Sequence, residues 1–207
     1  MIALYGMLDS PFVRRVAISL SLYELPFEHY PLSVFKDYQE FKKINPVVKA
    51  PTLKLDNGVV LMDSSLILSY FESIVPAEKR LMPLSTPLFA KHLHQIGLAL
   101  TACEKGVQIS GEINRRPVEQ QSSIWLDRNT EQLLAAFQSL EMLISSQNHD
   151  SSQTSQMISQ ADITTVVAWS YTQYRLANRV EIQKFPHLHQ LANTLENLPI
   201  FKKNPIE

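Results

Sequence analysis

Short apolar segments of the kind that form β-strands are confined to the part of the chain before Asp63. Beyond Pro87 the apolar residues instead recur every three or four positions, which is the period of an α-helix. Between these parts, residues 77–87 are polar, carry two prolines and follow neither period, so they predict a linker. We therefore expect an α/β domain at 1–76 followed by an all-α domain at 88–207.

The first domain is predicted to have the element order βαβ-α-ββα. Its strands and helices are expected at residues 2–5, 11–20, 27–30, 35–44, 52–55, 59–62 and 65–73. The opening strand–helix–strand unit predicts a parallel pair of strands with a right-handed crossover. The last two strands are joined by Asp56-Asn57-Gly58, in which Asn-Gly supplies the positive-φ residues of a tight antiparallel hairpin. The sheet should therefore be mixed.

The second domain is predicted to contain only helices. Apolar stripes indicate two long helices, at about 89–109 and 118–146, and residues 148–156 form a polar loop. Ser159 followed three residues later by Asp162 is a capping box, which opens a further helix reaching Leu176. A closing helix is expected at 186–198.

Composition excludes several classes of protein. No apolar run approaches the roughly 18 residues of a membrane span, and a formal charge of −1 with scattered basic residues excludes a nucleic-acid partner. The stretch from Met1 to Tyr5 lacks a basic lead and soon meets Asp9, so it predicts no export signal and a cytoplasmic location. The single cysteine, Cys103, cannot form an internal disulfide.

The first candidate site is Ser10-Pro11 at the start of the first predicted helix. Serine is a favoured N-cap and proline fits the first helical position. Four unpaired N–H groups and the helix dipole at such a start favour an anion, so a thiolate beside Ser10 would be stabilised. A thiol ionises near pH 8.5, and lowering its pKa by about two units takes roughly 2.7 kcal/mol. The simpler interpretation is that Ser10 only caps its helix.

The second candidate is Pro51, which stands at the entry to a predicted strand. A cis Ala50–Pro51 bond would turn the backbone groups of Ala50 outward, where an extended peptide can pair with them like an added strand. The alternative is an ordinary trans proline at the edge of the sheet.

The third candidate is Asp63-Ser64 at the start of a later helix. A hydroxyl and backbone N–H groups there can bind a carboxylate, while the acidic side chain can bind an ammonium group. Both groups together suit the head group of an amino acid. A second N-cap explains the same two residues.

These three features follow one another on the loops of one βαβ-α-ββα unit, and in that order they resemble the glutathione-binding blocks of the glutathione S-transferase family. The likeness is carried by residues 10–20, 45–53 and 63–64, and in the C-terminal half by 159–163 and 185–188. The sequence Ser-Pro-Phe-Val-Arg most resembles serine-type members, such as the tau class and related bacterial proteins. Val48 departs from many relatives, which carry glycine there.

The resemblance implies a thioredoxin-like first domain that binds glutathione as co-substrate, and a helical domain that contributes the pocket for a second substrate. It implies an enzyme, a glutathione transferase that conjugates the thiolate to small hydrophobic electrophiles in detoxification, and a homodimer. A protein that keeps the fold but serves as a catalytically silent partner-binding or regulatory module is the alternative.

Carried over by position, Ser10 would be the catalytic residue that holds the sulfur. The residues that would bind the rest of glutathione are Phe12, Lys36, Lys49, Ala50, Pro51, Asp63 and Ser64. Ala50 would pair with the cysteinyl unit beside a cis Pro51, and Asp63 and Ser64 would hold the γ-glutamyl end. The two lysines would approach the glycyl carboxylate. Candidate wall positions of the second pocket are Phe12, Leu100, Cys103 and Tyr171.

Other conspicuous residues have structural interpretations. The pairs His92/His94 and His187/His189 are two residues apart, so on a helix they point about 200° apart and predict no metal site. Cys103, inside a long helix, is expected to be a small buried hydrophobe, and Asp162 a structural cap. Arg14 and Arg15 are expected on a solvated face, unless one of them tunes the thiolate.

Overall fold

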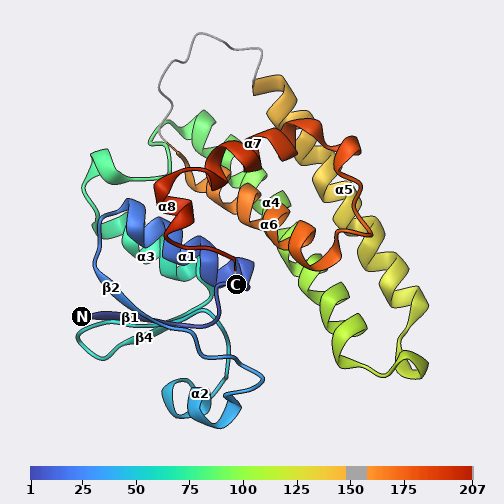
Figure 1. The fold of residues 1–207 in the computed structure, drawn as a ribbon. Helices are drawn as coiled ribbons and strands as arrows, with labels where there is room; N and C mark the ends of the chain where they lie inside the picture. The colour runs from blue at the N-terminus through green and yellow to red at the C-terminus, as the bar shows by residue number, and fades with distance from the viewer. Residues whose placement is uncertain (148–157, 207) are drawn as a thin grey trace. The chain divides into compact units, whose positions relative to one another are not determined.

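The computed structural model describes residues 1–147 and 158–206 (Figure 1). The polar loop expected at 148–156 lies outside the described residues. The chain divides into two compact units. The first contains Met1–Leu81 and Leu198–Glu207, and the second contains Met82–Asn197. The last residues of the chain, which the sequence assigns to the helical domain, thus group with the first unit.

The first unit is built on a four-stranded mixed sheet. In chain order its elements are β1 (Ile2–Tyr5), α1 (Pro11–Leu22), β2 (Phe27–Tyr30), α2 (Tyr38–Ile44), β3 (Thr52–Lys54), β4 (Val60–Met62), α3 (Ser64–Ile74), the 3-10 turn η1 (Ala77–Lys79) and α8 (Pro199–Lys202). The strands have the order β2-β1-β3-β4, with β1 parallel to β2 and the other pairs antiparallel. Figure 1 shows α1 and α3 together on one side of the sheet. This confirms the predicted thioredoxin-like βαβ-α-ββα order.

The hairpin between β3 and β4 differs from the prediction in its loop. Gly58 has a positive φ of 87°, and Asn57 does not. The N–H of Gly58 donates to the oxygen of Leu55, and the N–H of Leu55 to the oxygen of Val59, at 2.9 Å each. Asn57 accepts the N–H of Val59 at Oδ1 instead. The turn is therefore a three-residue loop that ends in a left-handed glycine, and only one residue needs positive φ.

Helix α1 is buried on more sides than its apolar stripe predicts. Every residue from Val13 to Leu20 is buried, including Arg14 and Arg15, which are 2% and 1% exposed. The expectation of a solvated arginine face is therefore wrong. Partners hold both guanidinium groups inside: Arg14 Nε donates to the Asn204 oxygen at 2.8 Å, and Arg15 donates to hydroxyls at the start of α3.

The second unit contains only helices among its described residues. They are α4 (Thr86–Arg115), α5 (Ser123–Gln147), α6 (Gln160–Leu176) and α7 (Pro186–Glu196), with 3-10 turns η2 (Val118–Gln120) and η3 (Ile182–Lys184). Helix α4 is longer than predicted, because Pro87 fits its first turn instead of delaying it. The stripe predicted on α5 is confirmed in the core, where Phe137 packs edge-on against Trp169 of α6 at 5.3 Å between ring centroids.

The starts of α6 and α7 are closed by carboxylates. The predicted capping box is confirmed at α6, where Ser159 Oγ accepts the Asp162 N–H at 3.2 Å and Asp162 accepts the Ser159 N–H at 3.0 Å. At α7, which has no cap from its own preceding residue, the carboxylate of Glu141 reaches over from α5. The predicted closing helix at 186–198 ends at Glu196, and Pro199 opens α8.

Candidate functional site

Ser10 caps α1, as the simpler interpretation of its sequence predicts. Its backbone is extended, and its Oγ accepts the N–H of Val13 at 3.4 Å. The expected four unpaired N–H groups are reduced, because Pro11 has none, Ser10 donates to the Met7 oxygen at 3.2 Å and Val13 donates to Ser10 Oγ. Among the residues that the structure describes, only the Phe12 N–H of this turn lacks a partner. The half-buried Ser10 hydroxyl also keeps its own proton for donation.

The loop that carries Ala50 and Pro51 is fixed by two buried side chains. Asn45 Nδ2 donates to Thr52 Oγ1 at 2.8 Å, and Thr52 Oγ1 donates to the Lys49 oxygen at 2.6 Å. The Ala50–Pro51 bond is cis, which confirms that prediction. No hydrogen bond within the described part of the chain involves the backbone of Ala50. The sequence does not reveal Asn45 as a clamp, because an asparagine directly after a predicted helix is ordinarily explained as the end of that helix.

Gly6 brings the Ala50 loop against the first turn of α1. Its φ is +134°, and a Cβ placed on it would lie 2.6 Å from Val13 Cγ2 and 3.0 Å from Ala50 Cβ. Only glycine fits between these two side chains. Two of the three predicted blocks are therefore adjacent in the folded unit.

Val48 lies in the left-handed region, with φ of 51°, and its N–H donates to the Asn45 oxygen at 2.9 Å. This conformation costs an L-residue with a Cβ roughly 1–2 kcal/mol, and β-branched residues rarely adopt it. A glycine at this position would adopt it without that cost. The loop thus keeps its turn despite the valine.

Asp63 caps α3 and has a positive φ of 70°. Its Oδ1 accepts the N–H of Ser65 at 2.9 Å, and its Oδ2 lies 3.4 Å from Lys49 Nζ. Both side chains of this ion pair are about half exposed, so its contribution to stability is small. The structure therefore brings together two groups that the resemblance assigns to opposite ends of glutathione.

Ser64 lies deeper than its neighbours, with 3% of its surface exposed. Its Oγ accepts from Nη1 of Arg15 at 3.2 Å, which joins α1 to the start of α3. Behind this contact, Tyr23 donates to Glu72 Oε1 at 2.6 Å. Burial raises the pKa of Tyr23 above its ordinary value, and the bond to Glu72 raises it further. Arg15 was the functional candidate that the sequence concealed, since an arginine in a helix is ordinarily exposed.

The other predicted residues are not brought into this arrangement by polar contacts. Lys36 is exposed in the turn before α2, and its ammonium group forms no ion pair with a described residue. Phe12 is half-buried, and Pro51 is buried. Cys103 is fully buried in α4, which confirms its interpretation as a small hydrophobe and removes it as a wall residue; Tyr171 is 6% exposed in the same core.

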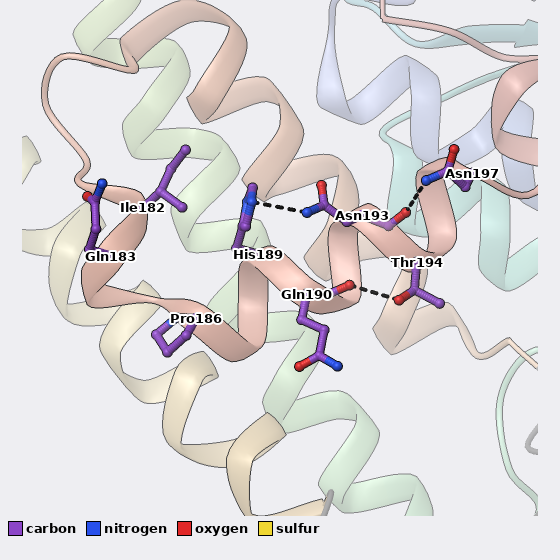
Figure 2. Close-up of a pocket in the computed structure, with 8 residues that line it drawn as sticks. All are labelled: Ile182, Gln183, Pro186, His189, Gln190, Asn193, Thr194 and Asn197. Atoms are coloured by element: carbon purple, nitrogen blue, oxygen red, sulfur yellow. Dashed lines mark hydrogen bonds between the residues drawn. The ribbon is translucent and has the colours of Figure 1, made fainter.

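A cavity of about 530 Å³ lies beside α7 and η3, and no predicted site residue is among those that line it (Figure 2). Its lining consists of Ile182, Gln183, Pro186, His189, Gln190, Asn193, Thr194 and Asn197. Several of these side chains bond along their own helix, such as Asn193 Nδ2 to His189 Nε2 at 3.0 Å. No group of three or more potential metal ligands occurs among the described residues, and none of their helices has the length and apolar character of a membrane span.

Comparisons with known proteins identify the fold. Residues 4–79 match the family model "Glutathione S-transferase, N-terminal domain". A solved glutathione S-transferase from Methylobacterium radiotolerans, in complex with glutathione sulfonate, superposes with a TM-score of 0.87 over 98% of this chain and 93% of its own, at 23% identity. At that identity the likeness establishes the fold alone. The chain has the glutathione S-transferase fold, as predicted.

Curated relatives bear two kinds of name. "Probable maleylacetoacetate isomerase 1" of Drosophila melanogaster is 26% identical over 96% of this chain and 79% of that protein. "Glutathione S-transferase Z1" of Arabidopsis thaliana is 35% identical, over 44% of this chain and 39% of that protein. The second match thus spans well under half of the relative. The expected likeness to the tau class stays a prediction.

Proposed function

We propose that this chain is a glutathione transferase whose first unit binds glutathione and whose Ser10 stabilises the thiolate that attacks small hydrophobic electrophiles. The observation that carries the proposal is the start of α1, where the Ser10 hydroxyl proton and the Phe12 N–H are both left for a ligand. The names of the relatives, and the glutathione sulfonate bound to a solved neighbour, support the same substrate.

The donors at α1 are sufficient to ionise a bound thiol. Lowering a thiol pKa by about two units, which makes it mostly thiolate at neutral pH, takes roughly 2.7 kcal/mol. A hydrogen bond to a charged acceptor contributes about 1.5–3 kcal/mol, and a helix dipole about 0.3–1 kcal/mol. One serine hydroxyl and one N–H at a helix start can therefore supply the free energy needed to lower the thiol pKa, without a cationic side chain beside the sulfur.

The remaining assignments follow the polar groups of the first unit. The backbone of Ala50 pairs with the cysteinyl unit, Asp63 binds the γ-glutamyl ammonium and Ser64 its carboxylate. Lys49 and Lys36 approach the glycyl carboxylate, and for this Lys49 leaves Asp63. An exposed ion pair contributes only about 0–1 kcal/mol, so the charges of glutathione can replace it.

In the proposed reaction the thiolate sulfur forms a bond to an electrophilic carbon of the second substrate. The electron pair displaced from that carbon leaves with a departing group, or enters a conjugated double bond that then takes a proton from water. The rate is raised mainly because the nucleophile is ionised and held in place.

A second candidate is isomerisation, which is favoured by the match to a protein named as a probable maleylacetoacetate isomerase, over 96% of this chain and 79% of that protein. A thiolate that adds reversibly to a conjugated cis double bond leaves a single bond, which rotates before the sulfur is eliminated. The cis substrate then becomes trans and glutathione is returned. Consumption of glutathione distinguishes the two reactions, because conjugation uses one molecule per turnover and isomerisation uses none.

We also propose a cytoplasmic homodimer that acts in detoxification. Helix α3 exposes an apolar stripe of Leu66, Tyr70 and Ile74, which are 66%, 36% and 55% exposed. A stripe of this kind on a helix is typical of an interface between subunits. Light scattering in solution tests the dimer, and a monomer at micromolar concentration would contradict it.

The first experiment is calorimetry of glutathione binding to the wild type and to Ser10→Ala, with the ultraviolet thiolate band and turnover of a generic aromatic electrophile. We expect Ser10→Ala to lower kcat/KM by about 100-fold, the cost of losing one donor to a developing anion, and to abolish the thiolate band. Helix stability should fall by only about 1 kcal/mol.

Ser10→Thr is the matched control, because it keeps the hydroxyl and most of the capping ability. Binding with turnover that survives in Ser10→Ala would contradict the role of Ser10. Absence of glutathione binding by the wild type would overturn the enzyme and leave the alternative of a partner-binding protein with this fold.

A further inference from the structure

Arg15 is a buried cation to which the proposed reaction assigns no role. It belongs to α1, is 1% exposed, and its Nη1 donates to Ser64 Oγ and to Ser65 Oγ at 3.2 Å each. Arginine is almost never this deeply buried unless partners hold its charge. Two of its partners are hydroxyls in the first turn of α3, the turn to which the γ-glutamyl group is assigned.

The chemistry of these bonds sets the direction of both hydroxyls. A guanidinium group has only donors, so each serine oxygen must meet Arg15 with a lone pair. The single proton of each hydroxyl therefore points away from Arg15 and is left for another acceptor. In the same turn the N–H groups of Ser64 and Leu66 have no hydrogen-bond partner within the described residues.

The charges around this turn are complementary to those of an amino-acid head group. A permanent positive charge, Arg15, stands behind the turn and adds to the positive end of the helix dipole. Asp63, with a side chain 45% exposed, places a negative charge at the rim. A ligand that carries a carboxylate and an ammonium on one carbon meets the donors with the first and Asp63 with the second.

We propose that Arg15 is a positioning residue for the α-carboxylate of the γ-glutamyl group. It turns the hydroxyls of Ser64 and Ser65 toward that carboxylate and holds a positive charge behind them. The proposal rests on the proposed binding of glutathione and deepens it.

Arg14 provides a matched control. It is the neighbouring residue of the same helix, is 2% exposed, and its Nε donates to the backbone oxygen of Asn204. Replacing either arginine by lysine removes one buried guanidinium from α1. The fold is expected to be weakened in both variants, but only the change at Arg15 removes the donor that orients the serines.

The experiment compares two ligands on the full chain by calorimetry: glutathione, and an analogue in which 4-aminobutanoyl replaces the γ-glutamyl group. The analogue keeps the ammonium and the peptide but lacks the α-carboxylate. We expect the wild type to prefer glutathione by at least about tenfold, the value of a charge-assisted hydrogen bond. Arg15→Lys should reduce this preference to about threefold or less and leave the affinity for the analogue unchanged.

Arg14→Lys should keep the preference of the wild type. In a Ser64→Ala background, Arg15→Lys should have less effect than in the wild type, because a residue that acts through Ser64 is not additive with it. Loss of affinity for both ligands to the same extent in Arg15→Lys would reveal a structural role only and would overturn the proposal.

A second measurement covers the case in which Arg15→Lys does not fold. In the wild type labelled with ¹⁵N, glutathione should shift the Arg15 guanidinium signals and the analogue should not. Equal shifts with both ligands would overturn the proposal. A wild type that binds glutathione without preference over the analogue overturns this inference alone, whereas a wild type that binds neither ligand overturns the proposed function with it.

Discussion

Helices α1 and α7 begin with the same turn but differ in what fills it. Pro11 and Pro186 stand in the first turn of the two helices. At α7 the two N–H groups that remain, on His187 and Leu188, donate to the carboxylate oxygens of Glu141 at 2.8 Å each. The start of α7 is therefore closed by a negative charge that the protein itself provides.

At α1 the corresponding N–H groups belong to Phe12 and Val13. Val13 donates to the uncharged hydroxyl of Ser10 at 3.4 Å, and Phe12 has no partner among the described residues. A proline-led first turn of this kind therefore accepts a full negative charge, which Glu141 provides at α7 and which a ligand would have to provide at α1. The carboxylate of Glu141 is thus an example, in the same chain, of an anion bound by the N–H groups of a helix whose first residue is proline.

Opening the start of α7 should have the largest effect. Glu141→Ala removes the hydrogen bonds from the His187 and Leu188 N–H groups and the contact with the His187 ring. It leaves the two N–H groups unpaired, so the free energy of unfolding should fall by about 2–3 kcal/mol. Urea unfolding followed by circular dichroism measures it. Glu141→Gln keeps one acceptor and should lose about half as much, and glutathione affinity should stay unchanged. A loss below about 0.5 kcal/mol would show that the carboxylate does not close the turn.

Closing the start of α1 is the converse change. Ser10→Asp places a carboxylate where the thiolate is proposed to bind, so glutathione affinity should fall by about tenfold or more through charge repulsion. The same carboxylate should stabilise the helix by about 0.5 kcal/mol. Calorimetry and thermal unfolding measure the two effects. Ser10→Asn, an uncharged cap of the same size, is the control, and it must lose less affinity than Ser10→Asp.

The start of α3 lies between these extremes, because Asp63 fills part of it and half of that side chain remains exposed. Asp63→Asn keeps a good N-cap but removes the charge. We expect stability to change by less than about 0.5 kcal/mol and glutathione affinity to fall by about fivefold. Lys49→Met, which removes only the ion-pair partner, should leave ammonium recognition intact. An unchanged affinity in Asp63→Asn would exclude Asp63 as the ammonium site.

The smallest effect on stability is expected from His92 of α4, which interacts electrostatically with Asp162, a residue of the capping box of α6. Burial lowers the pKa of His92, and Asp162 opposes that shift only in part. The folded chain therefore prefers the neutral ring, while the unfolded chain takes up a proton near pH 6.5. The neutral ring of His92 therefore makes its full contribution to the stability of the fold above about pH 6.5. This contribution is lost as the pH falls through the lower pKa that His92 has in the folded state.

Thermal unfolding between pH 7 and pH 5 tests this prediction. The melting temperature of His92→Gln should fall less with acidification than that of the wild type. His94→Gln, an exposed position on the same helix, is the control and should follow the wild type. Identical curves for the wild type and His92→Gln would contradict a depressed pKa.

Local patterns predicted much of this molecule, because periodicity and capping act over a few residues. The order of elements, the Ser159 capping box and the position of Ser10 at a helix start all follow from neighbours in the sequence. The cis bond at Pro51 followed from the family resemblance.

Features that depend on distant partners could not be predicted in this way. The guanidinium group of buried Arg15 donates hydrogen bonds to Ser64 and Ser65 of another helix, and Glu141 accepts the N–H of His187, 46 residues away, at the start of α7. The sequence around a buried polar residue does not show which distant residue is its partner. A buried polar side chain therefore cannot be distinguished by local sequence from one on the surface. The polar framework of the candidate site therefore became visible only when the elements were packed.

The return of the chain to its first unit constrains how the protein can be made. Residues from Leu198 onward group with Met1–Leu81, and the Asn204 oxygen receives the buried guanidinium of Arg14. During synthesis, α1 leaves the ribosome long before this acceptor exists, so Arg14 has no Asn204 to hold it until residue 204 has been added to the chain. The helical unit, in contrast, is one uninterrupted stretch and can assemble while the sheet unit still waits for its last segment.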